Sequence, residues 1–248
     1  MTFTRAPHRH ETMLRETTLA ERTWLSPDYV RLRVRGEDLR GFAAPGEDDH
    51  VRLFFPDDDQ GPLREGASRQ YTPLRWDAEE GWLELEFLVH GTEGVAGRWA
   101  ANAPIGSRVG VAGPRGSRVL EGTPDAWLLV GDETAVPAIR RFIAAMPADA
   151  VGRVIIEVQD TDHELDLEVP GGVTLTWTHR SDAPSSSLVT AMAAMTADDR
   201  PAGQVFAFIA AEQSIVKPGR ELVLERWNLD PEQVVIKGYW KLGEVDVD

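Results

Sequence analysis

Apolar and polar positions follow two different rhythms along this chain. In the first half, short runs alternate between apolar and polar residues, and a period of two is typical of half-buried strands. Runs of this kind or short apolar runs predict strands at residues 30–34, 50–55, 68–72, 82–89 and 108–111. A short helix is predicted at residues 94–101. Because the other runs follow one another without helices, this half predicts a small antiparallel barrel.

In the second half, strands alternate with helices. The pattern predicts strands at residues 127–130, 154–158, 173–177, 205–210 and 234–237. It predicts helices at residues 135–146, at residues 188–195 and around residues 219–227. Such alternation indicates a parallel sheet, and right-handed crossovers place the carboxyl ends of its strands along one edge. We therefore predict a barrel domain at residues 12–122 and an α/β domain at residues 123–248.

The stretch at residues 127–146 joins a buried strand to an amphipathic helix through Gly131, Asp132, Glu133 and Thr134. In open α/β sheets, the free N–H groups and the positive end of the dipole of such a helix face the ligand. An ordinary joint, in which Asp132 or Thr134 only caps the helix, fits the same pattern.

Composition narrows the possible functions. The net charge of −15 opposes nucleic acid and anionic membranes as partners. The absence of cysteine excludes disulfides, thiolate nucleophiles and cysteine-held clusters. No apolar run exceeds seven residues and the start has no secretory pattern, so we expect a cytoplasmic protein without a membrane span. His8 and His10 lie in a segment that we expect to be disordered, and we predict no metal site.

Two segments have residues suited to a dinucleotide. Arg69, Gln70, Tyr71 and Thr72 fall on a predicted strand, where Arg69 and Tyr71 share a face. An arginine, a phenol and a small hydroxyl can bind a phosphate, pack on a ring and hydrogen-bond its edge. Residues 94–99 begin a short helix with small side chains, which lets backbone N–H groups approach a pyrophosphate. Each signal alone is weak.

Taken together, the motifs at residues 50–53, 69–72, 90–91, 94–99, 112–116, 131–137, 211–212 and 238–241 resemble the siderophore-interacting proteins. These proteins are a flavin-binding branch of the ferredoxin–NADP reductase superfamily. The resemblance runs from about residue 15 to the end of the chain. It implies a flavin-binding barrel followed by a nicotinamide-binding α/β domain. The implied activity is reduction of ferric siderophores by FAD with electrons from NADPH or NADH, releasing Fe(II). A general flavin or quinone reductase and a non-catalytic flavin- or siderophore-binding protein remain as alternatives.

The resemblance also implies roles for individual residues. Arg69 is expected to pair with a flavin phosphate, Tyr71 to pack beside the isoalloxazine ring, and Thr72 to act in catalysis near flavin N5. The remaining cofactor-binding residues implied are Gln70, His90, Gly94, Val95, Ala96, Gly97, Trp99, Asp132, Glu133, Thr134, Ala135, Glu212, Tyr239 and Trp240. Trp99 and Trp240 have an alternative role as ordinary core aromatics. The chain departs from the family pattern at Val95, Gly97, Ala211 and Lys241.

Charged residues suggest the nucleotide and the substrate site. Arg180 follows the third parallel strand, near the usual place of the 2′-phosphate in this superfamily, and slightly favours NADPH. Glu157 and Asp160 favour NADH if they face that phosphate. Lys237 and Lys241, two of only three lysines, and Arg115 are predicted to attract an anionic ferric siderophore. The alternative is that these cations are solvated surface residues. We expect a monomer.

Overall fold

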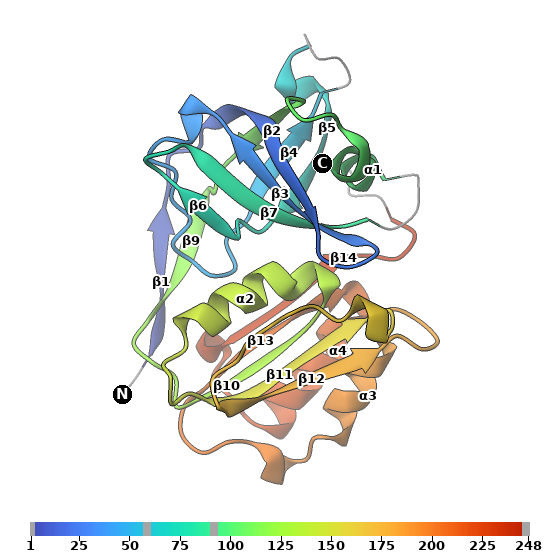
Figure 1. Ribbon diagram of the computed structural model, residues 1–248. Coiled ribbons are helices and arrows are strands. Elements are labelled where there is room, and N and C mark those ends of the chain that lie inside the picture. The colour runs from blue at the N-terminus through green and yellow to red at the C-terminus, as the bar shows by residue number, and fades with distance from the viewer. Residues whose placement is uncertain (1–2, 57–60, 90–93, 245–248) are drawn as a thin grey trace. The chain divides into compact units, whose positions relative to one another are not determined.

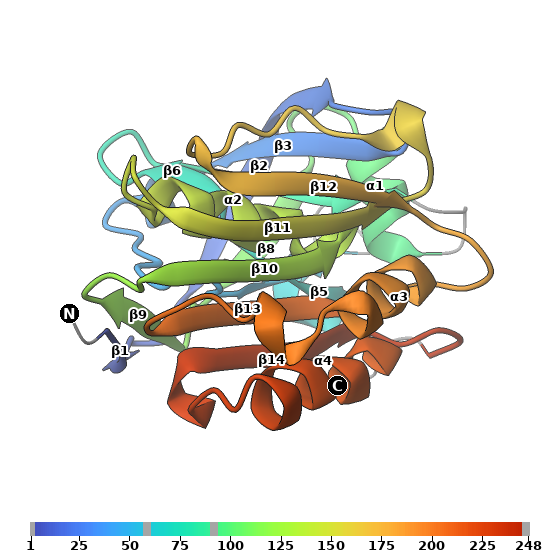
Figure 2. The same ribbon diagram turned by 90° about the horizontal axis from the view of Figure 1, so that it is seen from below.

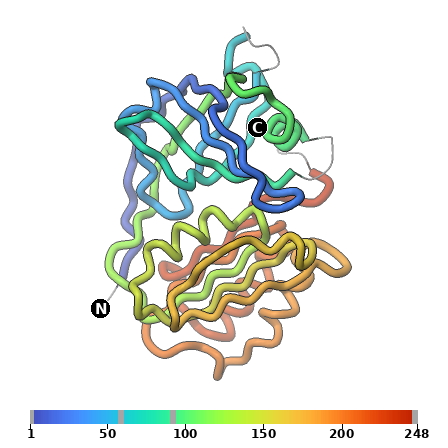
Figure 3. Tube along the Cα trace, viewed as in Figure 1, coloured from blue at the N-terminus to red at the C-terminus, as the bar shows by residue number. Residues whose placement is uncertain are grey.

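The computed structural model describes residues 3–56, 61–89 and 94–244. The chain divides into two compact units (Figure 1). We name Ala6–Val119 the half-barrel unit, and Met1–Arg5 with Leu120–Asp248 the α/β unit. Figure 3 follows the chain from the blue and green segments of the first into the green to red segments of the second.

The half-barrel unit contains one curled antiparallel sheet of seven strands in the order β5-β4-β8-β2-β3-β7-β6. This order is linear, so β5 and β6 form the two edges of the sheet. The strands are β2 (Leu14–Trp24), β3 (Tyr29–Arg35), β4 (Val51–Phe55), β5 (Ala67–Tyr71), β6 (Arg75–Asp77), β7 (Trp82–Leu88) and β8 (Arg108–Ala112). The predicted barrel is thus a half-barrel.

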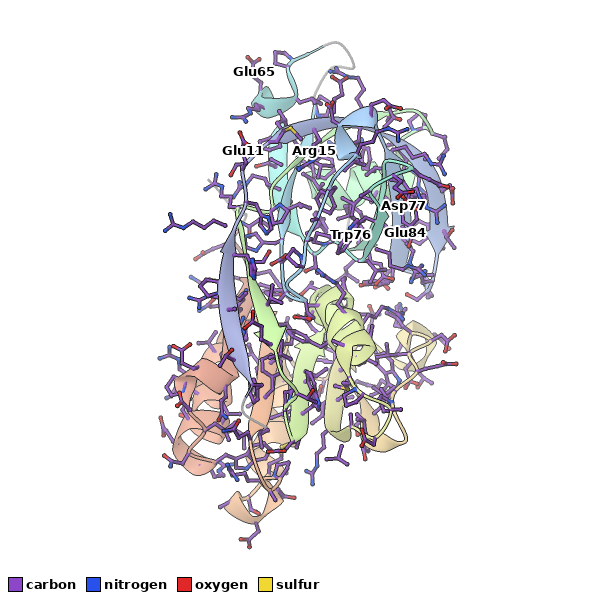
Figure 4. The ribbon with its side chains drawn as sticks, turned by 90° about the vertical axis from the view of Figure 1, so that its left-hand side faces the viewer. Glu11, Arg15, Glu65, Trp76, Asp77 and Glu84 are labelled. Atoms are coloured by element: carbon purple, nitrogen blue, oxygen red, sulfur yellow. The ribbon has the colours of Figure 1, made fainter. Side chains whose placement is uncertain are left out.

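The two faces of the half-barrel follow the predicted period of two. Leu32 of β3 lies opposite Leu85 of β7, and both are fully buried in the core. On the other face, Arg33 lies opposite Glu84 and donates a hydrogen bond of 2.7 Å to it. Figure 4 shows Glu84 beside Trp76 and Asp77 of the neighbouring strand β6. Cross-strand ion pairs therefore neutralise the carboxylates that this face buries.

The helix α1 (Val95–Asn102) packs against β3, β4, β5 and β7. Its C-terminal end is held by Arg22 of β2, which donates to the carbonyl oxygens of Ala100 at 2.7 Å and Ala103 at 2.5 Å. These bonds satisfy carbonyl groups that have no partner within the helix.

The N-terminal segment corrects one prediction. β1 (Thr4–Arg9) pairs with β9 (Gly116–Glu121) in a separate two-stranded sheet. His10 Nε2 lies 2.7 Å from Ser117 Oγ, so the expectation of disorder around His8 and His10 was wrong. Pro7 and the polar residues of this segment hide the strand from a search for apolar alternation. Strands β2, β6 and β9 were also not predicted.

The α/β unit contains a five-stranded parallel sheet in the order β12-β11-β10-β13-β14 (Figure 2). The strands are β10 (Ala126–Asp132), β11 (Val151–Val158), β12 (Gly172–His179), β13 (Val205–Glu212) and β14 (Val234–Trp240). The helices are α2 (Val136–Ala145), α3 (Ser186–Ala194) and α4 (Val216–Arg220), and α4 continues into a π-helical turn at Glu221–Arg226.

The two faces of this sheet bury different layers. Phe142 of α2 packs between Phe206 and Phe208 of β13, with both ring distances at 5.0 Å. The opposite face is covered by α3 and α4, which pack on Ala207 and Ile209. Every residue of β10 and β13 is buried because these strands have neighbours on both sides and helices on both faces. The predicted fold class, an antiparallel sheet domain followed by a parallel α/β domain, is confirmed, with the barrel open as a half-barrel.

Across the described ranges, no helix has the length and apolar character needed to span a membrane.

Candidate functional site

The strand β5 places Arg69 and Tyr71 on the core-facing side of the half-barrel. Arg69 lies opposite Leu53 and Tyr71 opposite Val51 of β4, and residues directly opposite share a face. The ring of Tyr71 packs on Phe87, with centroids 4.1 Å apart. Burial raises the pKa of the Tyr71 phenol, while the charge of Arg69 opposes this shift, so the phenol is neutral at physiological pH.

Arg69 keeps its charge available to an anion. Its Nη1 donates to the carbonyl oxygen of Ser68 at 2.6 Å, and no carboxylate within the described residues pairs with it. Thr72 follows β5 directly and is buried, whereas Gln70 is exposed. The segment therefore presents a half-buried cation, a neutral phenol and a buried hydroxyl within four residues.

Within the described ranges, no side chain caps the N-terminus of α1. Gly94 at the N-cap position has no side chain to accept from the helix, and the first turn has no acidic residue. The first N–H to find a helical partner is that of Arg98, which donates to Gly94 O at 3.0 Å. A Cβ added to Gly94 would meet nothing within 4 Å among the described residues. Among the described residues, the N–H groups of this first turn are therefore left without a side-chain acceptor, as binding of an anion there requires.

The helix α1 and the strand β5, which carries Arg69, pack against each other in the half-barrel unit. An available guanidinium and uncapped N–H groups fit the two phosphates of a flavin dinucleotide. Trp99 of α1 instead packs on Phe55, with ring centroids 5.3 Å apart. This contact agrees with the alternative prediction that Trp99 is an ordinary core aromatic. His90 lies outside the described residues.

At the carboxyl edge of the parallel sheet, Asp132 is buried and fully hydrogen-bonded. Its Oδ1 accepts from Thr134 N at 3.0 Å and from Thr134 Oγ1 at 2.5 Å. Its Oδ2 accepts from the indole Nε1 of Trp240 at 2.8 Å. Burial raises the pKa of Asp132, and the bonds from Thr134 and Trp240 oppose this. Asp132 therefore acts as a cap, which was one of its two predicted roles.

Arg180 lies between two buried carboxylates. Its Nη2 donates to Glu133 Oε2 at 2.6 Å, and its Nε donates to Glu157 Oε1 at 3.3 Å. Glu157 also accepts from Ser185 N at 2.7 Å and from Ser187 Oγ at 2.5 Å. Glu157 therefore faces Arg180 and the loop after β12. Binding of a 2′-phosphate by Arg180 stays a prediction, because its charge is already shared with two carboxylates.

The exposed Asp160, the other carboxylate expected near a 2′-phosphate, accepts from Asp162 N at 3.0 Å and lies 2.6 Å from His163 Nδ1. Both contacts are made by Oδ1 of Asp160 with residues of the same turn.

Glu133 differs from Asp132 and Glu157 in its hydrogen bonding. Only 3% of it is exposed, and its Oε1 has no hydrogen-bond partner in the part of the chain that is described. Burial and the charge of Asp132 raise the pKa of Glu133 to about 7, while Arg180 opposes them. The turn that holds it is tight, because a Cβ on Gly131 would lie 2.5 Å from the Cβ of buried Ala135.

The last two strands hold the remaining predicted residues of this edge. Glu212 accepts from Ser214 N at 2.7 Å and from Leu242 N at 3.2 Å, so it anchors the segment after β14. Tyr239 contacts Phe208 edge to face at 6.4 Å between centroids. The methyl group of Ala211 belongs to the core under α3 and α4.

The predicted substrate cations are placed in both units. Lys241 pairs with Glu244, and both are exposed. Lys237 is half-buried on β14. Arg115 is exposed in the half-barrel unit, after a turn held by the buried Arg15, whose Nη1 donates to Gly113 O at 2.7 Å. Their convergence on one ligand stays a prediction.

Sequence reasoning missed three contributors to these sites: Arg22, Ser185 and Ser187. Nothing in the sequence pattern distinguishes Arg22 from the other arginines. The two serines lie in a stretch that the pattern predicts to be an ordinary loop. The available signal was Glu157, a charged residue that directly follows the apolar run at residues 154–156 within the strand β11.

Comparison with known proteins covers both units. The model for the "Siderophore-interacting FAD-binding domain" matches residues 18–65 and 62–118, and that for "Siderophore-interacting protein" matches residues 124–243. An NADPH-dependent ferric-chelate reductase of Escherichia coli is 31% identical, with 94% of each chain covered. The ferric vibriobactin reductase ViuB of Vibrio cholerae is 29% identical, covering 89% of this chain and 87% of the relative. The crystal structure of a siderophore utilization protein from T. fusca matches with a TM-score of 0.87 and 32% identity over 98% of each chain.

Proposed function

This chain belongs to the siderophore-interacting protein family, and we propose that it is an FAD-dependent reductase of ferric siderophores that uses NADPH or NADH and releases Fe(II). The observation that carries the proposal is the pairing of an available Arg69 with the uncapped N-terminus of α1 in one unit. The full-length similarity to a relative named as a ferric-chelate reductase supports the same activity.

FAD is the cofactor that the half-barrel unit fits. Arg69 binds a phosphate, and the first turn of α1, with Gly94, Val95, Ala96 and Gly97, binds the pyrophosphate. Tyr71 packs beside the ring system and Thr72 supplies a hydroxyl at its edge. When bound, FAD supplies the redox chemistry that passes electrons from a nicotinamide nucleotide to ferric iron.

The nicotinamide nucleotide binds at the carboxyl edge of the parallel sheet. Open α/β sheets bind ligands outside the carboxyl ends of their strands, where Asp132, Glu133, Thr134, Ala135 and Glu212 lie. Tyr239 and Trp240, at the end of β14, close this edge. For this chain, the similarity to a relative named as NADPH-dependent favours NADPH over NADH as the electron donor.

The ferric siderophore is the substrate, and its iron leaves as Fe(II). Reduction lowers the charge on the metal, which weakens its attraction for hard oxygen ligands. Lys237, Lys241 and Arg115 supply local positive charge for an anionic chelate on a protein with net charge −15. Charges beyond a Debye length of about 8 Å are largely screened, so nearby cations dominate. We further propose that the protein acts as a cytoplasmic monomer.

The test is spectroscopic and uses the whole chain loaded with FAD. Anaerobic addition of NADPH or NADH should bleach the yellow colour, and a ferric siderophore should restore it while an Fe(II)-specific chelator traps iron. If the protein is yellow and neither nucleotide bleaches it, it binds flavin without catalysing the reduction. A chain that cannot be loaded with FAD would overturn the proposal.

A further inference from the structure

The turn that carries Arg115 is bonded at both of its ends. Arg15 of β2 donates from Nη1 to the carbonyl oxygen of Gly113 at 2.7 Å, two positions before Arg115. Ser117, two positions after Arg115, donates from Oγ to Oδ2 of Asp49 at 2.6 Å. Arg15 and Asp49 are only 8% and 3% exposed, so both bonds are shielded from water. Two buried charged side chains therefore fix the backbone on either side of Arg115.

Arg15, labelled in Figure 4, is buried, and none of the ion pairs among the described residues includes it. Its guanidinium lies 5.1 Å from the ring centroid of Phe42 and also donates to the carbonyl oxygen of Met13 at 3.4 Å. Burial lowers the pKa of Arg15 and the charge of Asp38 opposes this, but an arginine stays charged at physiological pH. A buried charge destabilises a fold unless its partners offset it, and the shortest hydrogen bond of Arg15 goes to the Arg115 turn.

Arg115 itself combines a fixed backbone with an exposed side chain. Its carbonyl oxygen accepts from His10 N at 3.2 Å. Gly113 has a φ of 97°, in the left-handed region that favours glycine, so the turn has a specific backbone shape. No carboxylate in the described part of the chain pairs with the Arg115 guanidinium. The turn therefore presents an available cation from a backbone that is held in place.

The turn lies close to the proposed flavin ring within the half-barrel unit. A Cβ on Gly113 would lie 3.8 Å from Cα of Val51. Val51 is directly opposite Tyr71, the residue proposed to pack beside the ring system. Because neighbouring strands are about 4.8 Å apart, the turn is about 10 Å from Tyr71. A ferric chelate that takes electrons at this ring is therefore within reach of the long Arg115 side chain.

We propose that Arg15 is a positioning residue for the ferric substrate, because its bond to Gly113 sets the direction in which the turn presents Arg115 to an anionic chelate. The inference rests on the proposed function, since it needs a ferric chelate beside Arg115. Loss of the bond releases the Gly113 carbonyl, and the turn can then take other backbone directions. Because Arg15 is buried, it acts on the chelate only through Arg115.

The test is stopped-flow re-oxidation of the FAD-loaded, dithionite-reduced protein by two chelates, anionic Fe(III)–EDTA and a neutral hexadentate ferric trihydroxamate. Arg15→Met should raise the half-saturating concentration of Fe(III)–EDTA about tenfold and leave the limiting rate nearly unchanged. Arg115→Gln should do the same. The double variant should lose no more than either single variant, because two residues that act through one contact are not additive. The neutral chelate should react equally with all of them.

Two further variants separate positioning from damage to the fold. Arg15→Lys keeps the charge and one donor, so it should raise the half-saturating concentration less than Arg15→Met. If Arg15→Met does not fold, Arg15→Lys takes its place in the double-variant comparison. Arg108→Met is the matched control, because Arg108 lies on β8 and donates to the carbonyl oxygen of Gly61 at 3.2 Å, away from the turn. It should behave as the wild type.

The outcomes separate this inference from the proposed function. The inference is overturned, and the reductase stands, if Arg115→Gln leaves the reaction with Fe(III)–EDTA unchanged. The same holds if the effect of Arg15→Met adds to that of Arg115→Gln, extends to the neutral chelate, or is matched by Arg108→Met. If neither chelate re-oxidises the reduced wild type, the proposed function falls and the inference falls with it.

Discussion

The indole N–H of Trp240 donates a hydrogen bond of 2.8 Å to Oδ2 of Asp132, 108 positions earlier in the chain. This bond ties the end of β14 to the end of β10, although β13 lies between these strands in the sheet. The same carboxylate caps the turn at Glu133–Ala135 through Thr134. One buried side chain thus fixes both the start of α2 and the aromatic residue at the chain's last strand.

Removal of this carboxylate should therefore destabilise the α/β unit. Asp132→Ala loses a helix-type cap and leaves the indole N–H of Trp240 without its acceptor, so we expect a cost of about 2–4 kcal/mol. Urea unfolding followed by circular dichroism measures the change. Trp240→Phe, which removes only the indole bond, should cost less than Asp132→Ala. Equal stability of Asp132→Ala and the wild type would contradict the assignment.

Arg69 should contribute to FAD affinity and little to folding. It donates only to the Ser68 carbonyl among the described residues, so Arg69→Ala should leave the unfolding midpoint nearly unchanged. Loss of a charge-assisted phosphate contact costs about 1.5–3 kcal/mol, which is roughly a ten- to hundredfold weaker Kd for FAD. Flavin fluorescence titration measures this. Arg69→Lys should recover part of the affinity, and unaltered binding in Arg69→Ala would rule out the phosphate role.

The preference of the protein for NADPH over NADH tests whether Arg180 binds the 2′-phosphate. If Arg180 contacts the 2′-phosphate of NADPH, Arg180→Gln should weaken NADPH more than NADH, by about tenfold in relative kcat/KM. Stopped-flow reduction of the flavin by each nucleotide gives the ratio. Equal losses for both nucleotides would show that Arg180 acts only through its bonds to Glu133 and Glu157.

The raised pKa of Glu133 predicts a pH-dependent stability. A carboxyl that holds its proton more tightly when folded stabilises the protein fully below its unfolded value of 4.5, and this stabilisation is lost as the pH rises through about 7. We expect Glu133→Gln to flatten the fall in unfolding free energy between pH 5 and pH 7.5, by about 2–3 kcal/mol. Denaturant titrations at several pH values measure the slope. An identical slope in the variant would show that Glu133 ionises normally.

Lys237 and Lys241, near the end of β14, should affect the reaction with the ferric substrate and not the reduction of the flavin. The double change Lys237→Glu and Lys241→Glu should leave reduction of the flavin by NADPH nearly unaltered. Re-oxidation by an anionic ferric chelate should slow several-fold at low ionic strength and lose its salt dependence. Lys217→Glu, on α4, is the matched control. Unchanged re-oxidation in the double variant would place the substrate elsewhere.

Periodicity predicted most elements of both units, because apolar side chains mark the face or strand that must be buried. It also placed Arg69 and Tyr71 on one face of one strand, as β5 has them. Periodicity does not show how polar groups pair. Glu84 and Glu86 occupy positions typical of a solvated face, yet they are buried against Arg33 and Arg31 of the opposite strand.

The cluster around Glu157 was beyond sequence reasoning for a different reason. Ser185 reaches it from 28 residues away, through a loop in which Ser185 itself has a left-handed φ of 65°. Few non-glycine residues adopt this conformation, and no local pattern predicts it. Only the folded loop shows that Arg180, Ser185 and Ser187 meet one carboxylate.

The position of β5 at an edge of the half-barrel has a consequence for how the protein keeps its cofactor. In the described part of the chain, β5 has a backbone partner only in β4, so the strand that carries Arg69 and Tyr71 is among the first able to open. A ligand bound only by the closed strand opposes such opening by mass action, by about 2.7 kcal/mol at a hundred times its Kd. Amide hydrogen exchange along β5 should therefore slow as FAD is added, and scarcity of the cofactor should shorten the protein's lifetime.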